Sequence, residues 1–492
     1  MKTDGSAQLS WATVSAGVTS DDEFNTKAGT NAGNNFNGTN ATDNTLYGYD
    51  AGTAITDGDD NTFIGYQAGA ATTESSLHTA IGHRALASHN ASAASGQQGN
   101  TAIGWGSMMD STSSYNTTAV GKEAMENSID GYQNVMIGYY AAHDGFQSGN
   151  GHDNIGIGTS CFNSATSALY NIGIGGQALE DLTTGDYNNC IGHQSGMQLT
   201  EGAGNVALGY YSLSQITTGD NNIAIGNGTM SVGVVTGTEN ICLGANAGNS
   251  ITSGGSNIFI GHDAGKAMTD NGNNVCIGES AGLNLTSVEN VFIGSNAGKD
   301  ATGAAENTCV GRSSGLQLTT GDYNVFIGEK SGTNLSPSGS VTTGSGVACI
   351  GDTQISDLYC SDTSISSSDV RDKADIEEFK HGLDWINKLK PITYRWDKRV
   401  WYMDPNDTTT PQDKGPTPDG SKKRPRLHLG FRAQDVLEVE KSFGYAGKKD
   451  DMLTVNLNED NTAYGMKYER LVPILVNAIQ ELSAKVAALE AA

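Results

Sequence analysis

A short motif that ends in an apolar residue and a glycine, Asn-x-x-Ile-Gly in its commonest form, recurs through most of this 492-residue chain. Eighteen copies leave seventeen intervals between their glycines, and twelve intervals are 17 residues long; the others are 16, 18, 20, 22 and 23 residues. A fixed period of this length predicts a solenoid, in which each repeat forms one coil against its neighbours. The glycines lie at positions 48, 65, 82, 104, 121, 138, 158, 175, 192, 209, 226, 244, 261, 278, 294, 311, 328 and 351.

The positions around this glycine predict the parts of one coil. In copies such as 205–209, 257–261 and 324–328 the residues one and three before it are branched aliphatics. Period-two alternation places both on one side of a strand and the variable residue between them on the other. We expect the aliphatics to stack from coil to coil as a column. Three residues after the glycine a small side chain recurs, as in Ala68 and Ser195, which indicates that another backbone passes close by. A polar turn, often Thr-Thr-Gly-Asp, follows.

An asparagine four residues before the glycine recurs in nearly every coil, for example at Asn205 and Asn324. Stacked asparagine side chains form hydrogen-bonded ladders. A 17-residue coil is thin and buries few aliphatics, so an isolated stack would be marginal. We therefore predict a homotrimer of intertwined or side-by-side chains, with a shaft on the order of 80–90 Å at a rise of about 4.8 Å per coil.

The repeat resembles the head repeats of trimeric autotransporter adhesins, in which Asn-x-Ala-Ile-Gly recurs in a left-handed parallel β-roll. The segments 78–82 and 100–104, which read HTAIG and NTAIG, come closest. The period here is a few residues longer, and this difference leaves the handedness and the number of strands per coil open.

The character of the chain changes near residues 352–367. Of the 65 glycines, 58 precede residue 368, and seven of the eight prolines follow it. Residues 1–367 carry 8 Lys or Arg against 33 Asp or Glu, a net charge of −25, whereas residues 368–492 carry 20 against 21, a net charge of −1. We predict an N-terminal connector (1–43), a parallel β-solenoid shaft (44–351), a linker (352–367) and a C-terminal domain (368–492). The acidic part disfavours binding to nucleic acid and to anionic membranes.

The C-terminal region has an ordinary α+β pattern. Apolar residues at helical spacing predict a helix over 379–389, which Pro391 ends. A strand is expected at 392–396, and a strand and short helix at 427–439. The last helix, 468–489, is predicted to form a coiled coil because its apolar residues step by 4, 3, 4 and 3. These are Leu475, Ile479, Leu482, Val486 and Leu489.

Four ordered motifs in this region resemble the intramolecular chaperone domain of phage endosialidases and tail spikes. They are Ser368–Lys373 (SDVRDK), Gly382–Tyr394 (GLDWINKLKPITY), Gly430–Val436 (GFRAQDV) and Tyr468–Pro473 (YERLVP). The resemblance implies a domain that trimerises, templates a β-shaft and then cuts itself off. Asp435 stands where that family usually has Glu.

The same resemblance implies a catalytic pair. Ser368 would be the nucleophile and Lys373 the base, with cleavage between Ser367 and Ser368. A serine hydroxyl needs a nearby base, and a partly desolvated lysine can serve. From the residues alone, Ser368 is equally a linker serine, and its spacing from Lys373 carries no weight without the resemblance.

Together these features predict a mainly β protein: a trimeric parallel β-roll or β-helix shaft of about 17-residue coils, then a small α+β domain ending in a coiled-coil helix. The predicted function is a phage tail fibre in the virion that attaches to a bacterial surface receptor, glycan or protein, and contacts other tail or baseplate proteins. Two alternatives stay open: a tail spike depolymerase that cuts surface polysaccharide, and a bacterial trimeric surface adhesin. The absence of the apolar core of a signal peptide near the N-terminus argues against the adhesin.

We predict no cofactor, no metal and no membrane insertion. No uninterrupted apolar run approaches the roughly 18 residues that span a bilayer. Five of the seven cysteines (Cys190, Cys242, Cys276, Cys309 and Cys349) share one slot of the repeat and are expected to be small buried hydrophobes, since no zinc spacing occurs. The Gly-Asp-x-Asn turns lack the nonapeptide calcium pattern. Aromatic residues after corner glycines either pack the corner or stack on sugars; these are Trp105, Tyr139, Tyr140, Tyr210 and Tyr211.

Overall fold

The computed structural model describes residues 2–3, 9–10, 19–37, 39–90, 99–147, 150–355, 370–404 and 410–492. The chain forms two compact units, residues 1–289 and 290–492. The predicted mainly β fold is confirmed: both units contain coils of a parallel β-solenoid, and the second also contains a small α+β domain with a terminal helix. The trimer stays a prediction. Near the N-terminus, β1 (Lys2–Thr3) pairs antiparallel with β2 (Leu9–Ser10).

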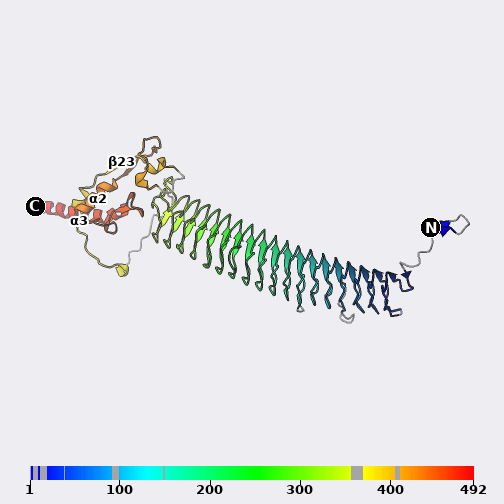
Figure 1. Cartoon of the computed structure of the whole chain (residues 1–492). Helices are drawn as coiled ribbons and strands as arrows, with labels where there is room; N and C mark the ends of the chain where they lie inside the picture. The colour runs from blue at the N-terminus through cyan, green and yellow to red at the C-terminus, as the bar shows by residue number, and fades with distance from the viewer. Residues whose placement is uncertain are drawn as a thin grey trace. The chain divides into compact units, whose positions relative to one another are not determined.

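The first unit is a stack of three-residue strands, drawn as a row of arrows in Figure 1. Successive strands pair in parallel and in register, for example β12 with β13, and a short antiparallel strand β3 (Thr19–Ser20) precedes them on β4. Parallel pairing begins with β4, which lies before residue 44 and pairs with β5. The predicted domain boundaries stay predictions. The strands are β4 (Thr26–Ala28), β5 (Thr45–Tyr47), β6 (Thr62–Ile64), β7 (Thr79–Ile81), β8 (Thr101–Ile103), β9 (Thr118–Val120), β10 (Val135–Ile137), β11 (Ile155–Ile157), β12 (Ile172–Ile174), β13 (Asn189–Ile191), β14 (Val206–Leu208), β15 (Ile223–Ile225), β16 (Ile241–Leu243), β17 (Ile258–Ile260) and β18 (Val275–Ile277).

The middle residue of each three-residue strand faces the interior of the coil, and the two flanking residues face outward. Phe63, Cys190 and Phe259 are fully buried there. The flanking aliphatics point to the outside of the coil, where Ile157 is 38 % and Ile191 is 41 % exposed. The predicted alternation is therefore present, and the aliphatic column that it forms lies on the outer face of the strand.

The corner glycine is required because the coils approach one another backbone to backbone. Gly65 has φ +141°, and a Cβ built on it would lie 2.3 Å from the carbonyl oxygen of Gly82 in the next coil. No larger residue fits at such a position. The small residue three places later also meets a neighbouring backbone, as predicted: Ser195 is buried, and its hydroxyl donates to the Ala207 carbonyl at 2.9 Å.

The asparagine ladder is confirmed. The buried side chain of Asn205 accepts hydrogen bonds from the backbone N–H of Asn222 (3.0 Å) and from its side-chain amide (3.1 Å). It donates in turn to Asn188 Oδ1 (3.0 Å) and to the Gly219 carbonyl (2.8 Å). Asn205 thus ties three coils together, and both its amide oxygen and its amide nitrogen have partners.

The cysteines of the repeat slot are confirmed as buried small hydrophobes. Burial raises the pKa of the Cys190 thiol to about 12, and it also raises the pKa of Cys242 and Cys309. Such thiols stay protonated and unreactive at neutral pH.

The second unit begins with four strands of the same kind and continues into the α+β domain. The expected strands and the last two helices are present. The helix expected over 379–389 is reduced to one turn, because the Asp384 carboxylate accepts the N–H groups of Gly382 (3.1 Å) and Trp385 (2.8 Å) and fixes the chain as a turn there. The elements are β19 (Val291–Ile293), β20 (Thr308–Val310), β21 (Val325–Ile327), β22 (Ala348–Ile350), η2 (Val370–Asp372), α1 (Leu383–Ile386), β23 (Ile392–Tyr394), η3 (Arg399–Tyr402), η4 (Gln412–Lys414), β24 (His428–Gly430), α2 (Ala433–Ser442), η5 (Lys449–Asp451), β25 (Val455–Leu457), β26 (Tyr464–Met466), η6 (Tyr468–Arg470) and α3 (Leu471–Glu490).

Candidate functional site

The predicted cleavage site lies outside the described residues, since both Ser367 and Ser368 fall in the stretch 356–369. Lys373, the predicted base of the catalytic pair, lies in the part of the chain that the structure describes. It is exposed and follows the short turn η2, where its backbone N–H donates to the Val370 carbonyl at 3.3 Å. The catalytic pair therefore stays a prediction.

The other motifs of the C-terminal domain come together in space. Trp385 is fully buried against Val439 of α2 and against Leu471 and Ile474 of α3. Strand β23 pairs antiparallel with β24, which joins the second motif to the third. The Tyr468 hydroxyl accepts the Phe431 N–H at 3.2 Å and so connects the third motif to the fourth. One small core thus explains why these separated sequences occur in one domain.

A buried carboxylate fixes the link between α2 and β25. Glu440 is fully buried, and its Oε1 accepts the N–H groups of Thr454 (2.6 Å) and Val455 (3.0 Å) as well as the Thr454 hydroxyl. Its Oε2 accepts the Leu453 N–H at 3.0 Å. Four donors satisfy the two oxygens of this buried side chain, so Glu440 holds the link between α2 and β25 in place.

Helix α3 leaves its predicted heptad seam open to solvent. Ile479 is 66 % and Leu489 is 78 % exposed, and Leu475, Leu482 and Val486 are also exposed. Together with η6 it is the one helix in the described parts of the chain that is long and apolar enough to cross a membrane, with a mean hydropathy of 1.3 and 17 % of that window buried. The search of the sequence for an uninterrupted apolar run did not find this helix, because polar residues interrupt its apolar ones. Its heptad spacing is typical of a coiled coil.

Trp105, one of the aromatic candidates, belongs to a row of stacked rings along the shaft. The rings of Tyr49 and Tyr66 lie 5.4 Å apart, those of Tyr66 and His83 5.0 Å, and those of His83 and Trp105 5.7 Å, all nearly parallel. The Lys122 ammonium covers the other side of Trp105 at 5.2 Å from the ring centroid. These contacts fit the packing role, and a sugar contact by the exposed part of Trp105 stays a prediction.

Tyr139, Tyr140, Tyr210 and Tyr211 form similar contacts. The rings of Tyr139 and Tyr140 meet edge to face at 4.2 Å, and those of Tyr210 and Tyr211 at 4.3 Å. A receptor contact in which these rings stack on a sugar stays a prediction.

The acidic turns have a structural role. Asp186 Oδ1 accepts the Leu169 N–H at 2.8 Å, and Asp220 Oδ1 accepts the Ala203 N–H at 2.7 Å, so each aspartate binds the backbone of the preceding coil. Asp59 and Asp322 do the same. Each of these carboxylates thus holds two neighbouring coils together, which gives the acidic turns a structural explanation.

One group of three potential metal ligands occurs in the described part of the chain: Glu123, Glu126 and His143, whose ligand atoms lie within 4.8 Å of one another. Lys122 Nζ lies 2.9 Å from Glu123 Oε1, and His143 Nε2 lies 3.0 Å from Glu126 Oε2. Burial and then the charge of Glu123 raise the pKa of Glu126. Both carboxylates are thus paired with neighbouring side chains, and these ion pairs account for the cluster without a metal ion.

Comparison with known proteins identifies one part of the chain. No curated protein is similar enough to count as a match. Residues 368–447 match the family model of peptidase S74, described as the chaperone of endosialidase, and the chain therefore contains a domain of this kind directly after its β-solenoid.

Proposed function

We propose that this protein is a homotrimeric tail fibre of a bacteriophage, part of the virion, that attaches to a receptor on the host surface. The C-terminal domain drives trimerisation, and other tail or baseplate proteins hold the fibre. The proposal is supported by the match of residues 368–447 to the chaperone of endosialidase and by the β-solenoid that precedes this domain.

The uncovered aliphatic face of the solenoid is the observation that carries the trimer. Parallel sheets are normally covered on both faces. Here the outer face of many strands carries two partly exposed aliphatics, such as Ile155 and Ile157 of β11 or Val325 and Ile327 of β21. In other strands, β5 to β9 among them, a threonine takes the first of these two positions. Another copy of the chain has the same coil spacing and an apolar face of the same kind, so it covers this face in register. The exposed seam of α3 supplies a second self-complementary surface.

Light scattering after size-exclusion chromatography tests this proposal. A trimer of the intact 51.2 kDa chain has a mass of about 154 kDa (three times 51.2). A folded, stable monomer would refute the trimer. Binding of the fluorescently labelled fibre to whole bacteria, and its loss after the surface glycans or proteins are stripped, tests attachment. A cleared zone in a capsule layer would instead favour the depolymerase.

We also propose that the domain cuts the chain between Ser367 and Ser368. The Ser368 hydroxyl attacks the carbonyl carbon of Ser367, and Lys373 takes the hydroxyl proton. The amide nitrogen leaves as the free amine of Ser368, and water then hydrolyses the ester. On a denaturing gel the wild type would give fragments of 367 and 125 residues, whereas Ser368→Ala and Lys373→Met would stay intact. Identical intact bands for all three proteins would refute this step.

A further inference from the structure

The last interval of the repeat is the longest, 23 residues between Gly328 and Gly351, and its extra residues form a loop with unusual burial. Residues 331–336 are all buried, although Ser331, Thr333, Asn334 and Ser336 are polar. Loops normally lie on the surface because their backbone groups need water or partners. A buried polar loop at the end of a solenoid indicates that another part of the chain covers it.

The hydroxyls of this loop are bonded within the last coil, for example that of Ser331 to the Cys349 carbonyl, and the C-terminal domain supplies further polar partners. The Gln412 side-chain amide of η4 donates to the Ser336 carbonyl at 2.8 Å. The Asn334 side-chain amide donates to the Thr410 carbonyl at 2.7 Å. The Trp401 indole N–H of η3 donates to the Thr353 carbonyl at 3.1 Å. Each of these bonds joins the end of the solenoid to a residue that follows the predicted cleavage site.

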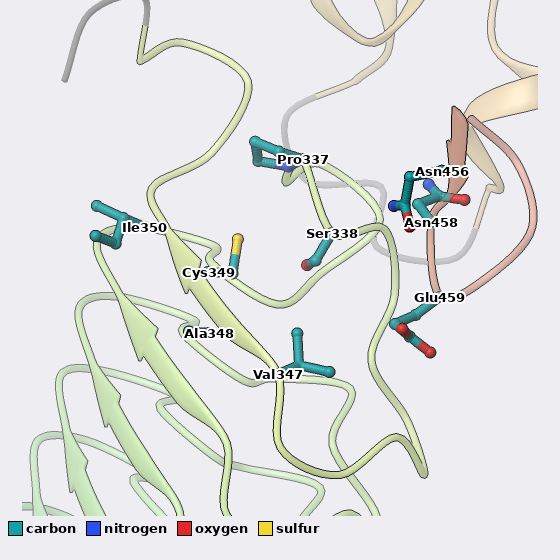
Figure 2. Close-up of a pocket in the computed structure, with 9 residues that line it drawn as sticks. All are labelled: Pro337, Ser338, Val347, Ala348, Cys349, Ile350, Asn456, Asn458 and Glu459. Atoms are coloured by element: carbon teal, nitrogen blue, oxygen red, sulfur yellow. The ribbon is translucent and has the colours of Figure 1, made fainter. Parts of the chain in front are cut away.

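A second set of contacts comes from the turn between β25 and β26. The Glu459 N–H donates to the Ser338 carbonyl at 3.0 Å, and the Ser340 N–H donates to Asp460 Oδ2 at 3.0 Å. Figure 2 shows Asn458 and Glu459 on one side of a pocket and the last strand, β22, on the other. The turn therefore lies beside the terminal strand of the solenoid.

An apolar contact lies beside these hydrogen bonds. Leu335 of the loop is 6 % exposed and packs in one cluster with Val400, Trp401 and Met403 of the domain, and Tyr402 packs against this cluster. The loop thus inserts one leucine into an apolar site of the domain, in the manner of an anchor residue at a protein interface.

We propose that the C-terminal domain is a docked end cap of the solenoid, and that it stays bound to the last coil without a covalent link when the chain is cut between residues 355 and 370. A terminal coil has unpaired strand groups that need covering. The contacts above join residues on either side of that cut. This inference deepens the proposed function but does not require self-cleavage, because the test uses a cut made from outside.

The test places a recognition sequence for a specific protease within residues 356–367 of full-length Ser368→Ala protein, which cannot cut itself by the proposed route. After digestion, size-exclusion chromatography under native conditions shows whether the two fragments elute together at the mass of the uncut assembly. We expect co-elution. Separate elution of the solenoid and the domain would overturn the proposal, whatever the number of chains in the assembly.

Two variants test the interface from its two sides. Leu335→Ser removes the anchor from the solenoid loop, and Gln412→Ala removes a hydrogen bond from the domain. After digestion, we expect most of the C-terminal domain to separate from the solenoid on the column in the Leu335→Ser protein. In Gln412→Ala, the fraction of domain that separates should be at least twice that of the digested parent. The control Leu427→Ser changes an exposed leucine of the same domain and should retain the domain as the parent does.

Circular dichroism of the undigested variants shows that each is folded before digestion. Equal retention in Leu335→Ser, Gln412→Ala and the control would refute these contacts as the ones that hold the cap.

Discussion

The asparagine ladder allows a quantitative test of what stabilises each coil. Asn205→Ala removes two accepted and two donated hydrogen bonds. The Asn222 side-chain amide keeps its bond to Gly237 (2.9 Å), and Asn188 Oδ1 keeps the Asn205 N–H (3.0 Å). The Asn222 N–H and the Gly219 carbonyl lose the partner that Asn205 gave them. Two orphaned buried groups at about 1–3 kcal/mol each predict a loss of about 2–6 kcal/mol per chain.

Urea denaturation at fixed protein concentration measures this loss as a shift of the midpoint at unchanged slope. Hydrogen exchange supplies a local readout, since the Asn222 amide should lose its protection while amides several coils away keep theirs. The control Asn227→Ala changes an exposed asparagine in the next coil and should stay within about 0.5 kcal/mol of wild type. If Asn205→Ala and Asn227→Ala unfold at the same midpoint, the ladder does not stabilise the coil.

Three further changes probe other parts of the structure. Burial lowers the pKa of His78 to about 3 and that of His89 to about 4. Between these values and the ordinary pKa of about 6.5, the unfolded chain binds more protons than the folded chain. The free energy of unfolding therefore decreases as the pH is lowered, by up to about 1.4 kcal/mol per pH unit for each histidine. His78→Asn restores the ladder residue and should flatten this decline between pH 7 and 4.5 in urea midpoints; an unchanged decline would refute it. Leu482→Lys on the open seam of α3 should lower the assembly mass in light scattering, whereas the neighbouring Ser483→Lys should not; equal masses would exclude the seam from assembly. Gly192→Ala, at φ +141° and with its Cβ 2.3 Å from the next corner carbonyl, should cost at least about 1–3 kcal/mol in thermal or urea unfolding; wild-type stability would contradict the close approach of the coils.

The periodic features of the fold could be predicted because each coil repeats the same local chemistry. A corner glycine, a small residue three places later and an asparagine four places before are each explained by one contact with the adjacent coil, and eighteen repeats make the pattern visible. His78 shows that the asparagine slot has some tolerance: its Nδ1 accepts the Asn100 N–H at 3.0 Å, so one of the ladder bonds survives.

Features that depend on partners distant in sequence could not be predicted in the same way. The 23-residue interval before Gly351 was visible as a length, but Ser336 in it is bonded by Gln412 from 76 positions away, and Thr353 beyond it is bonded by Trp401 from 48 positions away. The helix expected over 379–389 was wrong in extent because its apolar spacing suits a compact turn packed around Trp385 equally well. No local pattern distinguishes these cases.

The outward position of the aliphatics separates two kinds of stabilisation in this protein. Within one chain, the ladder asparagines, the corner glycines and the buried middle residues hold each coil to the next. These contacts leave the largest branched side chains half exposed on the strand, and burying them requires a surface with the same repeat spacing. Substitutions of the ladder should therefore lower the stability of the chain at any protein concentration, whereas substitutions of the aliphatic face should act through assembly and weaken as concentration rises.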